Sequence, residues 1–180
     1  MSLRKLRLKA VWLIVIPFFF FSRPTVGLVA SGAVLAAVGL WIRGWSAGTI
    51  DKDEELTTSG PYAFTRNPLY VGSLVIGIGV SLAGGHWVWP TVFLLFYAGM
   101  YGRTMAHEEA RLRELFGDRY LDYATHVPGF LPRATPYRTG ASGGGSGFRW
   151  SQYTRNREWE ASLGALVAFG ILLSKSLWAG

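Results

Sequence analysis

Four apolar segments, each about long enough to cross a bilayer, constrain the fold of this chain more than any other feature. A transmembrane helix needs roughly 20 mostly apolar residues, and the segments cover residues 26–45, 69–85, 87–106 and 159–178. Only 16% of the 180 residues are charged, against about 25% in a typical soluble domain. The sequence therefore predicts an all-α protein, a polytopic helical bundle that is integral to a membrane.

A fifth apolar segment, 10–21, is shorter and contains Pro17. It is long enough to span only if Leu6 and Leu8 join it and the basic side chains between them extend toward the headgroups. A signal peptide would also place basic residues before an apolar run, but no small-x-small cleavage motif follows this one. We therefore expect about five transmembrane helices.

The distribution of charge predicts the orientation of these helices. With a cytoplasmic N-terminus, five spans leave only Arg23 and Lys175 on the outer side. All other Lys and Arg residues, and all Asp and Glu residues, then fall on the cytoplasmic side or at its interface, as the positive-inside rule requires. The net charge of +7 is explained by this orientation and by attraction to anionic lipids, so we expect no nucleic-acid partner.

The chain divides into four predicted parts. Residues 1–46 form a transmembrane hairpin, 47–137 a core with two transmembrane helices and a cytoplasmic helix, 138–150 a Gly/Ser-rich linker, and 151–180 a C-terminal transmembrane helix. Within the core, 107–127 has helical periodicity with a break expected at Gly117. The residues that share its apolar face are Leu112, Leu115, Phe116, Tyr120 and Tyr123.

The first polar cluster is the segment 56–72, LTTSGPYAFTRNPLYVG. Its Gly-Pro pair predicts a turn, Asn67 is a candidate N-cap for the next helix, and Pro68 suits the first helical position. A helix start at the headgroup level accounts for most of this segment. It does not account for Arg66, which lies among several aromatic residues.

The second polar cluster is His107, Glu108 and Glu109, at the mouth of the fourth predicted span. Adjacent carboxylates at a membrane surface are costly to desolvate unless they meet a cation. That cation is either a neighbouring arginine, as on a solvated helix face, or a bound ligand. S-adenosylmethionine would suit both clusters, because its sulfonium and ammonium groups are cations and its carboxylate needs an arginine or amide donors.

Glycines are frequent in two of the predicted spans. Gly32, Ala36 and Gly39 lie at helical spacing and suit a close contact between helices. The third span holds further glycines, which either pack tightly or leave bare backbone against a ligand. These are Gly72, Gly77, Gly79, Gly84 and Gly85.

The segment LTTSGPYAFTRNPLYVG, followed downstream by EEARLRELFGDRYLDYATHVPGFLP, resembles the isoprenylcysteine carboxyl methyltransferase family. That family includes prokaryotic relatives and is similar to the phospholipid N-methyltransferases. The resemblance covers roughly 56–132, and the order and separation of the two motifs carry it. It implies an enzyme of a prokaryotic inner membrane, with a cytoplasmic active site, that uses S-adenosylmethionine to methylate a carboxylate, amine or thiol of a lipophilic or lipid-linked substrate.

The resemblance also implies roles for individual residues. It places Arg66 and Glu109 in the cofactor pocket. For the methyl transfer itself, our own hypothesis is that Arg66 or Arg103 holds an anionic group of the acceptor and that Glu109 or His107 serves as base for an amine acceptor. Asn67 replaces the histidine of the eukaryotic enzymes, so no titratable group is expected there. The cofactor-binding residues that it implies are Glu55, Leu56, Thr57, Tyr62, Asn67, Pro68, Leu69, Tyr70, Gly77, Gly79 and Glu108.

Two other functions are compatible with the sequence. A sterol-type membrane reductase has a similar helix start, but the phosphates of NADPH need several basic side chains and the pair Glu108 and Glu109 would repel them. A small membrane subunit or scaffold without activity would use the extra C-terminal span for docking. Bound S-adenosylhomocysteine would argue against both.

Several chemistries are not supported. The chain has no cysteine, so disulfides and Cys-ligated metals are excluded. Its histidines, His86, His107 and His126, are scattered, so we predict no metal site. No Gly-rich loop follows a strand, so neither a P-loop nor a Rossmann site is expected.

Overall fold

The computed structural model describes residues 3–51, 55–138 and 147–178. In these residues all regular secondary structure is helical, which confirms the predicted all-α class. The elements are α1 (Leu3–Phe21), α2 (Val26–Thr49), the 3-10 helix η1 (Gly60–Ala63), α3 (Pro68–Ala83), α4 (Val88–Phe116), α5 (Asp118–His126), α6 (Trp150–Arg155) and α7 (Trp159–Trp178). The predicted linker falls largely on 139–146, outside the described residues.

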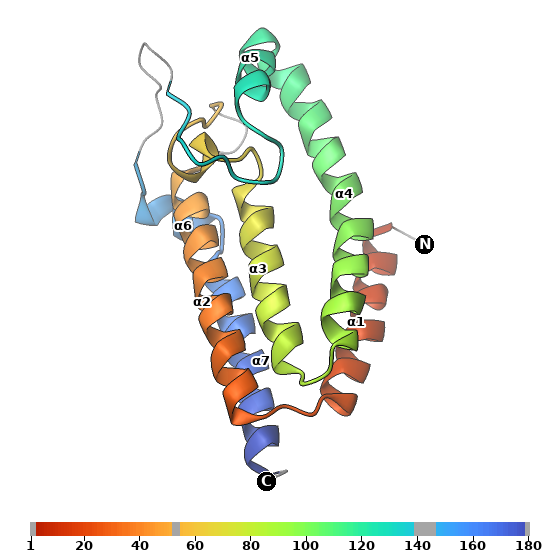
Figure 1. The fold of residues 1–180 in the computed structure, drawn as a ribbon. Coiled ribbons are helices and arrows are strands. Elements are labelled where there is room, and N and C mark those ends of the chain that lie inside the picture. The colour runs from red at the N-terminus through yellow and green to blue at the C-terminus, as the bar shows by residue number, and fades with distance from the viewer. Residues whose placement is uncertain (1–2, 52–54, 139–146, 179–180) are drawn as a thin grey trace.

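The long helices form an elongated bundle (Figure 1). The connections α1–α2 and α3–α4 lie at its lower end, whereas η1 and α5 lie at its upper end. In the described part of the chain, α2 and α7 are long and apolar enough to cross a membrane. Helix α3 and the segment Val11–Phe21 are also apolar but shorter.

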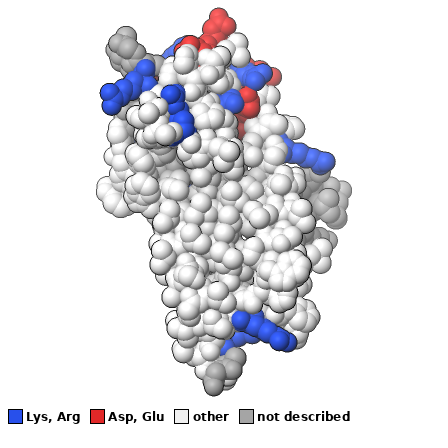
Figure 2. Space-filling view, viewed as in Figure 1, with Lys and Arg blue, Asp and Glu red and all other residues white. Residues whose placement is uncertain are grey.

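The outer surface of the bundle suits a lipid environment. In Figure 2, the visible face carries no Lys, Arg, Asp or Glu over its middle, and the charged side chains gather near the two ends. Many large apolar side chains point outward, among them Leu13, Val34, Trp41, Leu95 and Leu166. A soluble monomer rarely exposes contiguous apolar surface on this scale.

Helices α2 and α3 form the most extensive helix pair, and glycines permit its close approach. A β-carbon on Gly79 would lie 2.5 Å from the carbonyl oxygen of Gly32, and one on Gly39 would lie 2.7 Å from that of Gly72. Ala36 is buried in the same seam. The predicted close contact along Gly32, Ala36 and Gly39 is therefore confirmed.

Helix α4 runs from the predicted fourth span to Phe116 and ends at Gly117, whose φ of 51° places it in the left-handed region. The predicted break is confirmed there. Phe116 packs on a cluster built on Leu56, Tyr120, Tyr123 and Val127.

The prediction that Leu115 belongs to the apolar face is wrong. Leu115 is 49% exposed, whereas Leu112 and Phe116, one turn apart, both pack on the cluster. Helix α4 contacts the cluster along this row, and Leu115 lies about 100° around the helix from Phe116, on a side that faces away from it.

Lys175 connects α7 to the last turn of α1. Its Nζ donates to the carbonyl oxygens of Phe19 and Phe20 at 2.9 and 2.8 Å. These carbonyls belong to the last turn of α1, where no helical N–H is available and a cation is favourable. Lys175 therefore fastens α7 to α1 at the end of the bundle away from α5.

We predict that Gly79→Ala destabilises the protein, because the added methyl must separate α2 from α3; overpacking of this kind costs about 1–3 kcal/mol. Thermal unfolding in detergent, followed by far-ultraviolet circular dichroism, measures the effect. The matched control is Gly99→Ala in α4, where a β-carbon meets nothing within 4 Å and alanine should stabilise the helix by about 0.5–1 kcal/mol. Equal melting temperatures for the two variants would contradict the close contact of α2 and α3 at Gly79.

Candidate cofactor site

A cavity of about 250 Å³ lies where α3 begins. Both polar clusters of the sequence contribute to its wall. The lining residues are Ile50, Asp51, Glu55, Leu56, Thr57, Tyr62, Arg66, Asn67, Pro68, Leu69, Tyr70, Glu108, Arg111, Leu112, Phe116, Tyr120 and Tyr123. The structure therefore brings together segments that are about fifty residues apart in the sequence.

The segment just before α3 is hydrogen-bonded to the loop after α5. The backbone N–H of Arg66 donates to the carbonyl of Pro128 at 2.9 Å. The hydroxyl of Thr65 donates to the carbonyl of Phe130 at 2.9 Å. The loop after α5 thus holds the chain in place just before α3 starts.

Asn67 occupies the N-cap position of α3, but its side chain makes no cap hydrogen bond. Its Nδ2 instead donates to the carbonyl of Gly129 at 2.8 Å, so the predicted capping role of the side chain is wrong. The amide fastens the start of α3 to the loop after α5. Pro68 begins α3 as predicted.

The hydroxyl of Tyr70 donates to Oε2 of Glu108 at 2.9 Å. This hydrogen bond joins the start of α3 to α4 across the wall of the cavity. The carbonyl of Tyr70 accepts a hydrogen bond of 2.6 Å from the hydroxyl of Tyr97. Tyr70 is therefore held to α4 by both its side chain and its backbone. The Glu108 carboxylate is thereby oriented while remaining exposed.

Glu109 points to a different set of partners. Nη1 of Arg66 donates to Glu109 at 2.9 Å and to the hydroxyl of Tyr120 at 2.9 Å. Arg113 donates to the same oxygen of Glu109 at 2.8 Å.

Partial burial acts to raise the pKa of Glu109, but the hydrogen bonds from Arg66 and Arg113 outweigh it and leave the pKa below its usual value. A carboxylate stabilised in this way is a weaker base. The geometry therefore favours Glu109 as the anchor of Arg66 rather than as an acceptor of protons.

Tyr62 supplies a hydroxyl that has no partner among the described residues. The side chain is buried, and its OH makes no hydrogen bond. Burial raises the pKa of Tyr62 well above its usual range, so the hydroxyl keeps its proton and remains a donor. Buried polar groups in folded proteins nearly always have a partner, and Tyr62 is one of the residues that line the cavity.

The charges of the lining favour a cation. Three carboxylates, Asp51, Glu55 and Glu108, line the cavity together with two guanidinium groups, Arg66 and Arg111. Arg66 is already paired with Glu109, and Asp51 with Arg149. Apart from these, the lining carries the carboxylates of Glu55 and Glu108 and the guanidinium of Arg111. The balance suits a ligand with positive groups better than one with several phosphates.

Most of the residues predicted for the cofactor line this cavity, namely Glu55, Leu56, Thr57, Tyr62, Asn67, Pro68, Leu69, Tyr70 and Glu108. Gly77 and Gly79 do not. A β-carbon on Gly77 would lie 2.0 Å from the ring of Phe93 in α4, and Gly79 lies in the seam with α2. Both glycines serve helix packing.

Arg103 also lies outside the lining. It was expected to hold an anionic group of the acceptor, and its side chain is exposed on α4. The side of a helix that a charge occupies depends on its rotation relative to the neighbouring helices, which spacing along the sequence does not give.

Several lining residues were not predicted as site residues. They are Ile50, Asp51, Arg111, Leu112, Phe116, Tyr120 and Tyr123. The helical spacing of residues 112, 116, 120 and 123 indicated that they share a face. It did not indicate that this face lines the cavity at the start of α3. Asp51 carried no sequence signal.

A sequence model of a family described as phospholipid methyltransferase matches residues 25–119, which is more than half of the chain. This chain belongs to the phospholipid methyltransferase family. The matched stretch contains α2, η1, α3 and α4, and it ends before α6 and α7. The relationship to membrane methyltransferases that the sequence motifs predicted is confirmed.

Curated relatives point in the same direction. The protein-S-isoprenylcysteine O-methyltransferase of Schizosaccharomyces pombe is 30% identical over 120 residues, which cover 64% of this chain and 51% of the relative. The cobalt-zinc-cadmium resistance protein CzcN of Cupriavidus metallidurans is 35% identical over 115 residues, which cover 63% and 51%. The nickel-cobalt-cadmium resistance protein NccN of Alcaligenes xylosoxydans xylosoxydans is 34% identical over 116 residues, which cover 64% and 52%. The chain matches about half the length of each relative.

The pKa of Glu109 predicts a pH dependence of stability. Because the pKa is lower in the folded state, the carboxylate contributes stability above its unfolded value of about 4.3, and this contribution is lost as the pH falls through the folded value. Thermal unfolding from pH 6 to pH 3 should show the loss in the wild type. Glu109→Gln should reduce it, with Glu114→Gln on the exposed side of α4 as control. The same acid dependence in wild type and Glu109→Gln would contradict the Arg66–Glu109 pairing.

Proposed function

We propose that this member of the phospholipid methyltransferase family binds S-adenosylmethionine in the cavity at the start of α3. The observation that carries the proposal is the Tyr70–Glu108 hydrogen bond, which joins the two family motifs on the wall of one cavity. Tyr62, whose buried hydroxyl has no partner among the described residues, belongs to the same lining. These groups fit a ligand that carries both cationic and hydrogen-bonding functions.

Helices α1, α2, α3, α4 and α7 cross the inner membrane of a prokaryote in this proposal, with the N-terminus in the cytoplasm. The charge distribution supports this orientation, since the basic loops of membrane proteins face the cytoplasm. Arg23 and Lys175 mark the outer end, and the cavity lies at the cytoplasmic end. A soluble cofactor would enter from the cytoplasm and a lipophilic acceptor from the bilayer.

The residues of the cavity would have two functions: some would interact with charged and polar groups of the cofactor, and others would enclose it. Glu108, oriented by Tyr70, would face the cationic groups of the cofactor, and Tyr62 would donate to one of its acceptors. When bound, S-adenosylmethionine supplies an electrophilic methyl group on a positively charged sulfur. The surrounding helices would align the acceptor and shield the transferred methyl group from water, and alignment and enclosure supply most of the rate for such a displacement.

The acceptor is a lipophilic molecule with a carboxylate, amine or thiol. Arg66 lines the cavity and is the better placed of the two predicted arginines to hold an anionic group of the acceptor. Exposed Arg103 lies farther along α4 toward the membrane and would meet an acceptor only at the surface of the bundle. A carboxylate acceptor needs no base, whereas an amine acceptor would need one. Of the two candidates, Glu109 is made a weaker base by its hydrogen bonds with Arg66 and Arg113, and His107 is exposed on α4 outside the lining of the cavity.

We predict that S-adenosylhomocysteine binds the detergent-solubilised protein, measured by isothermal titration calorimetry. Glu108→Gln should weaken binding roughly 10- to 100-fold, because a hydrogen bond to a charged group contributes about 1.5–3 kcal/mol. Tyr62→Phe should weaken it up to about tenfold, through loss of one neutral hydrogen bond. Glu114→Gln is the control and should bind as the wild type does.

Tighter binding of NADPH than of S-adenosylhomocysteine would favour a reductase instead. Affinity for neither compound would favour a subunit without catalytic activity. Unchanged affinity in both Glu108→Gln and Tyr62→Phe would contradict this assignment of the site.

We predict that methyl-labelled S-adenosylmethionine, incubated with the protein and a lipid extract, yields a labelled lipophilic product detectable by mass spectrometry. The product mass and fragmentation identify the acceptor atom as oxygen, nitrogen or sulfur. Glu108→Gln should lower the yield at limiting cofactor by at least tenfold, in line with its loss of binding. Labelling that is equal with and without the protein would contradict methyl transfer.

A further inference from the structure

The C-terminal part of the chain, residues 147–178, lies outside the stretch that matches the family but contacts the walls of the cavity. In Figure 1, α7 runs beside α2, and α6 lies near the upper end of α2. Two separate sets of hydrogen bonds connect this part to the candidate cofactor site.

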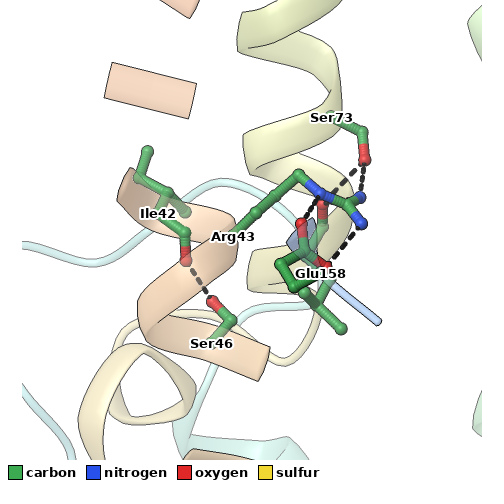
Figure 3. Close-up of polar contacts among 6 residues, drawn as sticks. Ile42, Arg43, Ser46, Ser73 and Glu158 are labelled. Atoms are coloured by element: carbon green, nitrogen blue, oxygen red, sulfur yellow. Dashed lines mark hydrogen bonds and ion pairs between the residues drawn. The ribbon is translucent and has the colours of Figure 1, made fainter. Parts of the chain in front are cut away.

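The first set centres on Arg43 of α2 (Figure 3). Its guanidinium forms a two-point ion pair with Glu158, which immediately precedes α7, and the Nη2–Oε2 distance is 2.9 Å. The Glu158 side chain is only 5% exposed. A carboxylate buried to this degree depends on its partner, so the start of α7 is held to α2.

The same guanidinium also reaches α3. Nη1 of Arg43 donates to the hydroxyl of Ser73 and, at 3.4 Å, to the carbonyl of Leu69. The Ser73 hydroxyl donates in turn to the Leu69 carbonyl at 2.9 Å. A planar guanidinium with several fixed donors can serve two helices at once in this way.

Gly72 provides the space for this arrangement. A β-carbon on Gly72 would lie 2.5 Å from Cγ of Arg43, so any larger residue would obstruct the arginine. The carbonyl that Arg43 holds belongs to Leu69 in the first turn of α3. Leu69 and its neighbours Pro68 and Tyr70 line the cavity.

The second set of contacts involves α6 and the end of α2. Arg149 and Gln152 both donate to the carboxylate of Asp51, which lines the cavity. Nδ2 of Asn156 donates to the carbonyl of Ala47 at 2.8 Å, and the backbone N–H of Arg149 donates to the carbonyl of Gly48, also at 2.8 Å. Helix α6 therefore holds the C-terminal end of α2 and the acidic residue beyond it.

We infer that the C-terminal segment completes the cofactor cavity, with Glu158 as a positioning residue that acts through Arg43 on the first turn of α3. Helix α6 positions Asp51 in the same cavity. The inference rests on the proposed function insofar as the cavity binds S-adenosylmethionine. The contacts with the first turn of α3 can be tested without any ligand.

The test compares Glu158→Gln with Glu160→Gln in the full-length protein in detergent. Glu160 is the matched control, because it is two residues away and forms an exposed ion pair with Arg157. Hydrogen exchange should be roughly tenfold faster at Tyr70–Ser73 in Glu158→Gln, since the first turn of α3 opens more often. Exchange around Ser22, where Lys175 fastens α7 to α1, should be unchanged.

The second measurement is the affinity for S-adenosylhomocysteine, which Glu158→Gln should lower about fivefold to tenfold, a factor of ten being 1.4 kcal/mol. If Glu158→Gln does not fold, Ser73→Ala decides the question, because it removes one α3 partner of Arg43 and keeps the ion pair. Ser73→Ala should also accelerate exchange at Tyr70–Val71.

The outcomes separate the two proposals. The positioning role would be overturned if the variants had the same hydrogen exchange and the same affinity as the wild type. It would also be overturned if exchange were accelerated to the same extent around Ser22. Failure of the wild type to bind S-adenosylhomocysteine would contradict the proposed function alone, and hydrogen exchange would still decide whether Glu158 positions α3.

Discussion

The close approach of α2 and α3 is the contact on which the rest of the structure depends. Backbone meets backbone at Gly32, Gly39, Gly72 and Gly79, so the two helices have one relative rotation and height. That arrangement lets Arg43 cross from α2 to the first turn of α3. Since the first turn forms a wall of the cavity, the geometry of the site follows from a contact between glycines.

Charged groups at the end of the bundle that carries the cavity are held in a specific pairing. Glu109 is paired with Arg66 and Arg113, and Glu158 with Arg43. Buried and partly buried charges are tolerated only with such partners. Glu108, by contrast, meets the neutral hydroxyl of Tyr70 and is exposed. Two adjacent glutamates thus have different partners because they lie on different sides of α4.

The sequence predicted the helices well because apolar length, glycine spacing and the break at Gly117 are local properties. It also predicted most of the lining, because residues 55–70 are contiguous and fold as one loop and helix start. It was wrong about the side chain of Asn67, which depends on the loop after α5, and about the exposure of Leu115, which depends on the rotation of α4. Spacing likewise did not show that Gly77 and Gly79 face other helices, or that Arg103 points outward.

What the sequence determined by itself was the class of protein: apolar segments of bilayer length require helices, and two motifs in order indicate the family. The tertiary structure alone decided which residues meet. It brought Tyr70 to Glu108, turned Glu109 toward Arg66, and placed Glu158 against Arg43 across more than a hundred residues of chain. Such contacts depend on the rotation and height of each helix in the bundle, and these are set by packing between helices that no local pattern records.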